Sequence, residues 1–152
     1  MKKVLKIIAW IIGSLLLLII GLIIYVRSVA QIDEPIVNET ASKGEPIEID
    51  SGLWRLNTNW FRQSESGLYE LYVEGSPFER GVAIGKLSHG LIQYQEKVFN
   101  DQFHQLVPSD SYLGVLKYFV GWFNRNLDDH VPEEFRQEIY GVSRVASHEF
   151  DD

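Results

Sequence analysis

The feature that most constrains this chain is an unbroken run of twenty residues, positions 7–26, that contains no charged side chain. A helix of that length rises about 30 Å, which is roughly the thickness of the hydrocarbon core of a bilayer. The run therefore predicts a transmembrane helix over residues 7–26 and excludes an ordinary soluble protein. It also makes the lipid bilayer the first expected partner of the chain.

The charges on either side of this run predict its orientation. Three lysines lie before it, within residues 1–6, whereas the acidic residues begin at Asp33. Because basic residues next to a membrane span favour the cytoplasmic side, we expect residues 1–6 to form a cytoplasmic basic tail. The rest of the chain is then expected on the outer, periplasmic or extracellular side of the membrane, held by a single-pass anchor.

A cleaved signal peptide is the alternative to an uncleaved signal-anchor. Ser28, Val29 and Ala30 form a small-x-small sequence that resembles a signal-peptidase site. The apolar core of a signal peptide, however, is usually about 7–15 residues long. The longer run seen here, and the charged Arg27 just before the cleavage sequence, favour the uncleaved anchor.

The charge balance and the cysteine count exclude several classes of function. Four of the 14 basic residues flank the apolar run, so residues 28–152 carry 10 basic and 21 acidic side chains. This excess of negative charge disfavours a nucleic-acid partner or an anionic membrane surface for the outer part of the chain. The absence of Cys excludes disulfides, a cysteine metal site and a cysteine nucleophile within this sequence.

Beyond the membrane run, the sequence predicts a tether and then a folded segment. Residues 27–50 are mostly polar and acidic and contain two prolines, which is typical of a flexible tether. Residues 51–152 are expected to form the folded part. Within it, residues 68–74 alternate between two faces and are rich in β-forming residues, which predicts a half-buried strand.

The clearest local pattern begins at Ser76. This residue can cap a helix, and it is followed by Pro77 at the first helical position and by Glu79 at the third. Ser and Glu at this spacing can cap each other's free backbone N–H groups, and Pro at the first position sacrifices no hydrogen bond. The pattern therefore predicts the start of a helix at Pro77.

We expect this helix to run without a break to about His104. Gly81 and Gly85 in its first turns would each weaken it by up to about 1 kcal/mol relative to Ala. The close approach of another backbone, such as a sheet beneath the helix, would account for them. The predicted apolar stripe of the helix is Ile84, Leu87, Leu91, Tyr94 and Val98.

Two further helices are expected. Residues 111–126 are apolar on nearly every side of the helix axis, so they need cover, and their length favours burial over a membrane span. A third helix is expected to begin near Pro132. Its predicted apolar stripe is Phe135, Ile139, Val142 and Ala146. Two or three strands offer too little surface for these helices, so a partner chain, a longer polypeptide or the membrane is expected to complete the core.

The residues themselves predict no catalytic site, no cofactor site and no metal site. His148 lies in an acidic segment, and His130 lies beside residues typical of a helix cap. His89 and His104 have no candidate partner next to them in the sequence, and no metal-ligand spacing is present. No Ser lies in a nucleophile-elbow sequence. No reaction follows from these residues alone.

Two motifs nevertheless stand out, in residues 68–87 and 131–142. The first is a strand ending in Glu-Gly, then a small residue, Pro, an aromatic residue, Glu and Gly-x-x-x-Gly, filled by Glu74, Gly75, Ser76, Pro77, Phe78, Glu79, Gly81 and Gly85. The second is Pro-x-x-aromatic-x-x-Glu-Ile-x-Gly, filled by Pro132, Phe135, Glu138, Ile139 and Gly141. Together they resemble the acyl-CoA:6-aminopenicillanate acyltransferase-like proteins, which are autoproteolytic cysteine N-terminal-nucleophile hydrolases and acyltransferases related to phospholipase-B-like proteins.

The resemblance covers roughly residues 52–147 and implies a fold class. The expectation is an α+β chain in which an N-terminal transmembrane helix precedes a partial αββα sandwich, incomplete in this chain. Members of that family cut their own precursor before a Cys, whose thiol then attacks an amide or thioester carbonyl. That Cys lies C-terminal to a segment like this one. Since the sequence has no Cys, no catalytic residue carries over, and the motif residues are expected to be structural.

The expected function is a membrane-anchored N-terminal segment of a cysteine-nucleophile amide hydrolase or acyltransferase, inactive alone. Its expected partner is the missing C-terminal part or subunit that carries the nucleophile. The aromatic residues within 118–123 are candidates either for core packing or for one wall of an acyl pocket. The alternative function is that of a small membrane-tethered interaction protein without enzymatic activity.

Overall fold

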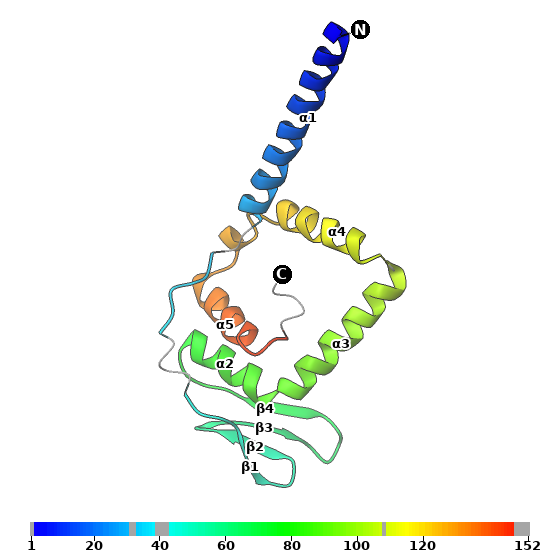
Figure 1. Ribbon diagram of the computed structural model, residues 1–152. Helices are drawn as coiled ribbons and strands as arrows, with labels where there is room; N and C mark the ends of the chain where they lie inside the picture. The colour runs from blue at the N-terminus through cyan, green and yellow to red at the C-terminus, as the bar shows by residue number, and fades with distance from the viewer. Residues whose placement is uncertain (1, 31–32, 39–42, 108, 148–152) are drawn as a thin grey trace. The chain divides into compact units, whose positions relative to one another are not determined.

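The computed structural model of the chain describes residues 2–30, 33–38, 43–107 and 109–147 (Figure 1). In those ranges it contains five α-helices, one short 3-10 helix and a four-stranded antiparallel sheet, which confirms a mixed α+β class. The elements in chain order are α1 (Lys2–Val29), β1 (Ile47–Asp50), β2 (Leu53–Leu56), β3 (Asn59–Gln63), β4 (Tyr69–Tyr72), α2 (Pro77–Leu87), α3 (His89–Leu106), α4 (Asp110–Phe123), η2 (Asp128–His130) and α5 (Glu133–Ser143).

The chain divides into two compact units. The first unit comprises Met1–Asp33 and Ser109–Leu127, and the second comprises Glu34–Pro108 and Asp128–Asp152. Residues 51–152, which are expected to form the folded part, are divided between these two units. The segment that contains α4 belongs with α1, because α4 packs against the last turn of that helix.

The first unit contains α1, and no described residue of this helix is buried. This helix is long and apolar enough to cross a membrane, and among the described residues it is the one helix that meets this criterion. It contains the whole predicted run of residues 7–26 and extends beyond it at both ends. The predicted helix is thus confirmed, and the bilayer as its surroundings stays a prediction.

Helix α4 begins one residue before the predicted start at residue 111 and ends three residues before the predicted end at residue 126. At its start, the Ser109 hydroxyl accepts a hydrogen bond of 3.4 Å from the Tyr112 backbone N–H. At its end, the backbone and side-chain amides of Asn124 both donate to the Val120 carbonyl at 3.0 Å. The Asn side chain closes the last turn and stops the helix at Phe123 rather than at residue 126.

The sheet of the second unit is a simple meander in the order β1-β2-β3-β4. Strand β4 confirms the strand predicted within residues 68–74. Strand β1 corrects the tether prediction, because residues 47–50 are part of the sheet rather than of a flexible segment. The alternation of Ile with acidic residues in Ile47–Asp50 is the sequence signal for this strand.

The register gives the sheet two different faces. Trp54 lies opposite Phe61, which in turn lies opposite Leu71, and side chains alternate along each strand. We call the first face, which packs on α2, the inner face; it carries Trp54, Leu56, Phe61, Tyr69 and Leu71. The other, which we call the polar face, carries Arg55, Trp60, Arg62, Glu70 and Tyr72.

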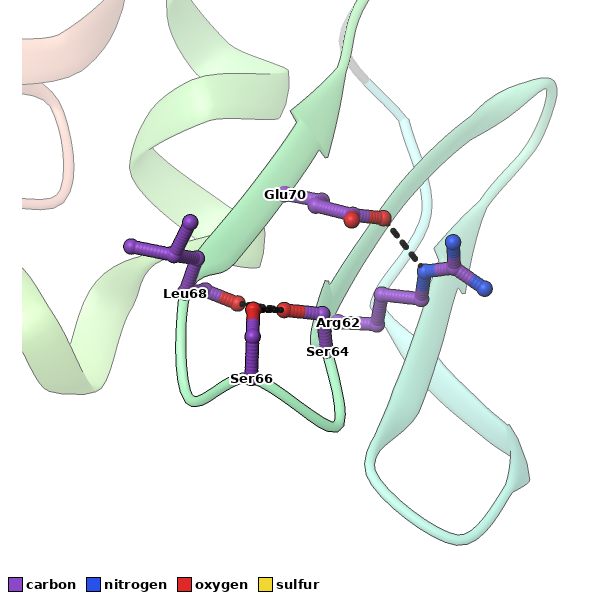
Figure 2. Close-up of polar contacts among 5 residues, drawn as sticks. All are labelled: Arg62, Ser64, Ser66, Leu68 and Glu70. Atoms are coloured by element: carbon purple, nitrogen blue, oxygen red, sulfur yellow. Dashed lines mark hydrogen bonds and ion pairs between the residues drawn. The ribbon is translucent and has the colours of Figure 1, made fainter.

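The polar face has the contacts of a solvent-exposed surface. The Arg62 Nε donates to the Glu70 carboxylate at 2.6 Å (Figure 2), and its guanidinium lies 5.4 Å from the ring centre of Trp60. In the turn between β3 and β4, the Ser64 hydroxyl donates to the Leu68 carbonyl and lies 2.9 Å from the Ser66 hydroxyl. These bonds fix the turn of the hairpin.

A small apolar core joins the inner face to α2. Leu56 from the sheet and Ala83 and Leu87 from the helix are buried together, and Phe61 and Val73 pack partly against them. Farther along the inner face, Tyr69 and Leu71 remain exposed. Helix α2 therefore covers only part of this face among the described residues.

The prediction of one helix from Pro77 to His104 is wrong, because the helix is interrupted at Ser88. The hydroxyl and the backbone N–H of Ser88 both donate to the Ile84 carbonyl, and the Ser88 backbone leaves helical geometry at φ −101° and ψ 17°. Helix α2 ends there and α3 starts at His89. The predicted stripe is consequently split between two helices, and Tyr94 is exposed.

The predicted apolar stripe of the third helix is correct only in part. In α5, Phe135 and Ile139 are 50% and 62% exposed. Val142, which belongs to the predicted stripe, does pack against α2, together with Glu138 and Gly141, which the predicted stripe left out. Close packing of the two backbones selects small residues and one ion pair for this face, and it leaves the larger apolar side chains uncovered among the described residues.

Candidate functional site: a glycine-mediated helix pair

The first motif is positioned by the start of α2. The Glu79 carboxylate accepts two hydrogen bonds from Ser76, one of 2.8 Å from the backbone N–H and one of 2.6 Å from the hydroxyl. These bonds hold the pKa of Glu79 below its usual value of 4.5, with the hydroxyl as the larger cause. Pro77 occupies the first helical position, so the predicted capping box is confirmed.

Gly75 sets the angle at which β4 leads into α2. Its backbone has φ 118°, a conformation that side chains with a Cβ rarely adopt. A Cβ on this residue would also lie 3.1 Å from the Glu79 carboxylate. The turn between β4 and α2 therefore requires the glycine at position 75.

The glycines of α2 and α5 form the centre of the site. A Cβ on Gly81 would overlap the Glu138 backbone carbonyl, and one on Gly141 would lie 2.6 Å from the Phe78 carbonyl. A Cβ on Gly85 would overlap the Val145 side chain. The predicted close approach of another backbone is confirmed, but the approaching element is helix α5 rather than a sheet.

An ion pair spans the same two helices. The Arg80 guanidinium donates to the Glu138 carboxylate at 2.8 Å, and the two side chains are 27% and 25% exposed. Arg80 also donates to the Gly75 carbonyl at 3.1 Å. One side chain thus links the capping turn of the first motif to the helix of the second.

The remaining motif residues frame this contact. The ring of Phe78 stacks on that of Tyr140 at 5.9 Å between centroids. Pro132 caps α5, and its carbonyl accepts from the backbone N–H groups of Phe135 and Arg136. The two motifs, which lie more than forty residues apart in the sequence, form one structural element.

Two clefts lie beside the helix pair in the second unit. The larger has a volume of about 670 Å³ and is walled by the inner face of the sheet and by the ends of α2 and α3. Its lining includes Trp54, Phe61, Tyr69, Leu87, His89 and Val145. The smaller, of about 330 Å³, is lined by residues that include Asn59, Glu74, Gly75 and Glu79.

Asn59 is a structural residue of this site that the sequence pattern missed. Among the described residues it is the one polar residue that is buried. Its side-chain oxygen accepts a hydrogen bond of 2.8 Å from the Glu74 backbone N–H. The Glu74 carboxylate accepts from the hydroxyls of Thr58 and, as a smaller cause, Tyr72, which lowers the pKa of Glu74. An Asn in the first position of a strand gave no signal of this role.

The histidines and the acidic residues are the remaining candidates for a functional group. Among them, no three His, Asp or Glu side chains are arranged to hold a metal ion. His89 lines the larger cleft, and His104 lies on α3 with its Nδ1 2.9 Å from the Asn100 carbonyl. His148 lies outside the described residues. The contacts around the motif residues are those of packing and capping.

The fold and the site together define a class: an α+β chain with an N-terminal helix able to span a membrane and a glycine-mediated helix pair beside a small sheet. Comparison with protein-family models, with curated proteins and with solved structures finds no match to this chain. The resemblance to acyltransferase-like proteins is therefore carried by the two motifs alone.

Proposed function

We propose that the second unit is the scaffold part of a membrane-anchored cysteine N-terminal-nucleophile amide hydrolase or acyltransferase, whose nucleophile is on a different stretch of polypeptide. The observation that carries this proposal is the contact between the two motifs. Gly81 and Gly141, each of which the resemblance singles out, lie against the backbone of the other helix. These two glycines, which carry the family resemblance, thus share one physical role: each lets the two helices pack closely.

The anchor and its orientation are part of the proposal. Helix α1 would cross the membrane with residues 1–6 in the cytoplasm, as the lysine distribution favours. The acidic remainder of the chain would then work on the outer side. A membrane-anchored scaffold would hold the catalytic part near substrates at the membrane surface.

The incomplete inner face supports the need for a second polypeptide. Tyr69 and Leu71 are exposed on a face whose other end is buried under α2. Phe135 and Ile139 are likewise exposed on α5. Further helices or strands, including the second sheet of an αββα sandwich, would cover these side chains and build the walls of an acyl-binding site from the cleft of about 670 Å³.

The chemistry would belong to the second polypeptide. The resemblance implies a Cys freed at the start of a chain by self-cleavage, whose thiol attacks an amide or thioester carbonyl. An oxyanion hole would stabilise the tetrahedral intermediate. Because the sequence of this chain has no Cys, its own contribution would be anchoring, packing and part of the substrate wall.

The test is to purify the full chain from its native membranes in mild detergent and to sequence the N-terminus of any bound polypeptide. The proposal expects a partner that begins with Cys, and a complex that hydrolyses fluorogenic N-acyl amides until iodoacetamide alkylates the thiol. Since this chain has no Cys, the inhibition must come from the partner.

A matched pair of variants controls for nonspecific capture. Gly81→Leu should lose the partner, because it separates α2 from α5. Gly114→Ala should keep it, because a Cβ on Gly114 meets no atom within 4 Å and this residue lines neither cleft. A chain that purifies without such a partner contradicts the proposal. A partner without an N-terminal Cys favours the alternative of a membrane-tethered interaction protein.

A further inference from the structure

Helix α4 presents an apolar face that no described residue of the first unit covers. Residues three or four positions apart lie on the same side of a helix. The side chains at this spacing are Tyr112, Val115, Phe119 and Phe123, which are 57%, 68%, 56% and 60% exposed. Four large apolar side chains exposed in one stripe need an apolar environment.

The opposite side of α4 is fixed to the end of α1. A Cβ on Gly121 would lie 2.9 Å from the Ala30 Cβ, so the two segments are in close contact there. The Arg27 guanidinium lies 5.8 Å from the ring centre of Tyr118. Arg27 is the first charged residue after the uncharged run, so these contacts place α4 at the level where that run ends.

The dimensions and composition of α4 suit the surface of a membrane. Its 14 residues rise about 21 Å, too little to span a bilayer. Tyr and Trp side chains prefer the interface between lipid and water, and α4 carries Tyr112, Tyr118 and Trp122. Lys117, on the same side as Gly121, can extend its ammonium group towards the headgroups.

We propose that α4 is an interfacial membrane helix, with Tyr112, Val115, Phe119 and Phe123 in contact with the acyl chains of the outer leaflet. This inference rests on the part of the proposed function that places α1 in the membrane. Lipid is the occupant, because α4 contacts the chain at Arg27 and Ala30, where the membrane run ends. The helix then needs no protein cover, and the expectation of burial is replaced by contact with lipid.

The absence of Cys allows a direct test with spin labels on the full chain in phosphatidylcholine vesicles. Single-Cys variants Val115→Cys and Phe119→Cys place labels on the exposed stripe at two positions, so that damage by one substitution does not decide the result. Lys117→Cys reports the opposite side, Ile19→Cys the middle of α1, and Ile36→Cys an exposed position of the second unit. Power saturation then measures collisions with oxygen and with a water-soluble nickel chelate.

The inference expects oxygen to reach the labels at positions 115 and 119 and the nickel chelate to be excluded from them, at a depth of roughly 5–10 Å. The label at position 117 should be shallower. Nickel access at positions 115 and 119 equal to that at position 36 overturns the inference, as does exclusion of both reagents, which signifies a protein cover. If the label at position 19 also meets the nickel chelate, the membrane anchor itself fails; protection at 19 alone leaves the anchor intact and rejects only the interfacial helix.

Discussion

Helices α2 and α4 both place a glycine against a neighbouring segment, but the two contacts have different consequences. In α2, the glycine contact with α5 completes a packed layer, and Phe78 and Val82 are each only 4% exposed. In α4, the contact between Gly121 and Ala30 fixes one side of the helix and leaves the opposite apolar stripe exposed. A glycine contact positions a helix, and burial of its apolar residues requires a second surface.

The largest expected effect follows from breaking the contact that completes the layer. Gly81→Leu must push α5 away, because even a Cβ at this position overlaps the Glu138 carbonyl. We expect a loss of about 3 kcal/mol in the free energy of unfolding of the second unit. Urea denaturation of the full chain in detergent, followed by tryptophan fluorescence, measures this loss.

The matched control is Gly90→Ala on α3, where a Cβ meets no atom within 4 Å. Replacing a helical glycine by Ala there should stabilise the chain by up to about 1 kcal/mol. Equal denaturation midpoints for the Gly81 and Gly90 variants would mean that α2 and α5 are not packed backbone to backbone.

The next largest effect on the free energy of unfolding is expected from truncating a covered side chain of the inner face, compared with truncating an uncovered one. Leu56→Ala removes a side chain buried against Ala83 and Leu87 and should cost about 2–4 kcal/mol. Leu71→Ala lies on the same face beyond the cover of α2 and should cost about 1 kcal/mol or less. Similar costs for both variants in the same denaturation experiment would show that the whole inner face is covered in the chain alone.

A smaller effect is expected from the ion pair between the two helices. Glu138→Gln keeps the shape of the side chain but leaves Arg80 charged and only about one-quarter exposed, so we expect a loss of about 1–2 kcal/mol. The control, Arg62→Gln, breaks an exposed ion pair on the polar face and should cost less than about 1 kcal/mol. A larger loss for Arg62→Gln than for Glu138→Gln would mean that the ion pair in the sheet contributes more to stability than the one between the helices.

The smallest effect concerns the capping box of α2. The Ser76 hydroxyl and, second, its backbone N–H lower the pKa of Glu79 in the folded chain, so the charged carboxylate is the stabilising form. Its contribution is present above the usual pKa of 4.5 and is lost as the pH falls through the lowered value. Glu79→Gln should therefore lower the denaturation midpoint at pH 6.5, and the difference from the unsubstituted chain should shrink as the pH is lowered below 4.5. A difference that does not change with pH would assign the role of Glu79 to packing.

Local patterns in the sequence predicted the local structure of the second unit well. The cap formed by Ser76 and Glu79 and the alternation of residues in β4 depend on neighbours within a few positions. The glycines also predicted a close backbone contact. They did not reveal its partner, because Gly141 meets Gly81 only in the folded chain.

The predictions that were wrong also depended on contacts that form only in the folded chain. A stripe of Phe135 and Ile139 has a helical period, but the packed face of α5 is chosen by Gly141, where two backbones can meet. The break at Ser88 depends on whether its hydroxyl bonds to the Ile84 carbonyl, which a helical pattern permits without requiring. The structural role of the motif residues stays a prediction, and nothing in the sequence indicated the clefts beside the helix pair.

The central claim is that the inner face of the sheet is open in this chain and covered by another polypeptide in the membrane. Tyr69→Cys places a single thiol on that face in the larger cleft, and Ser51→Cys places one in the exposed turn between β1 and β2. The measurement is the rate of maleimide labelling, in the purified chain and in native membranes. We predict that the thiol at position 69 reacts readily in the purified chain and at least tenfold more slowly in native membranes, while the thiol at position 51 reacts equally in both. Equal labelling of position 69 in the two preparations would contradict the account.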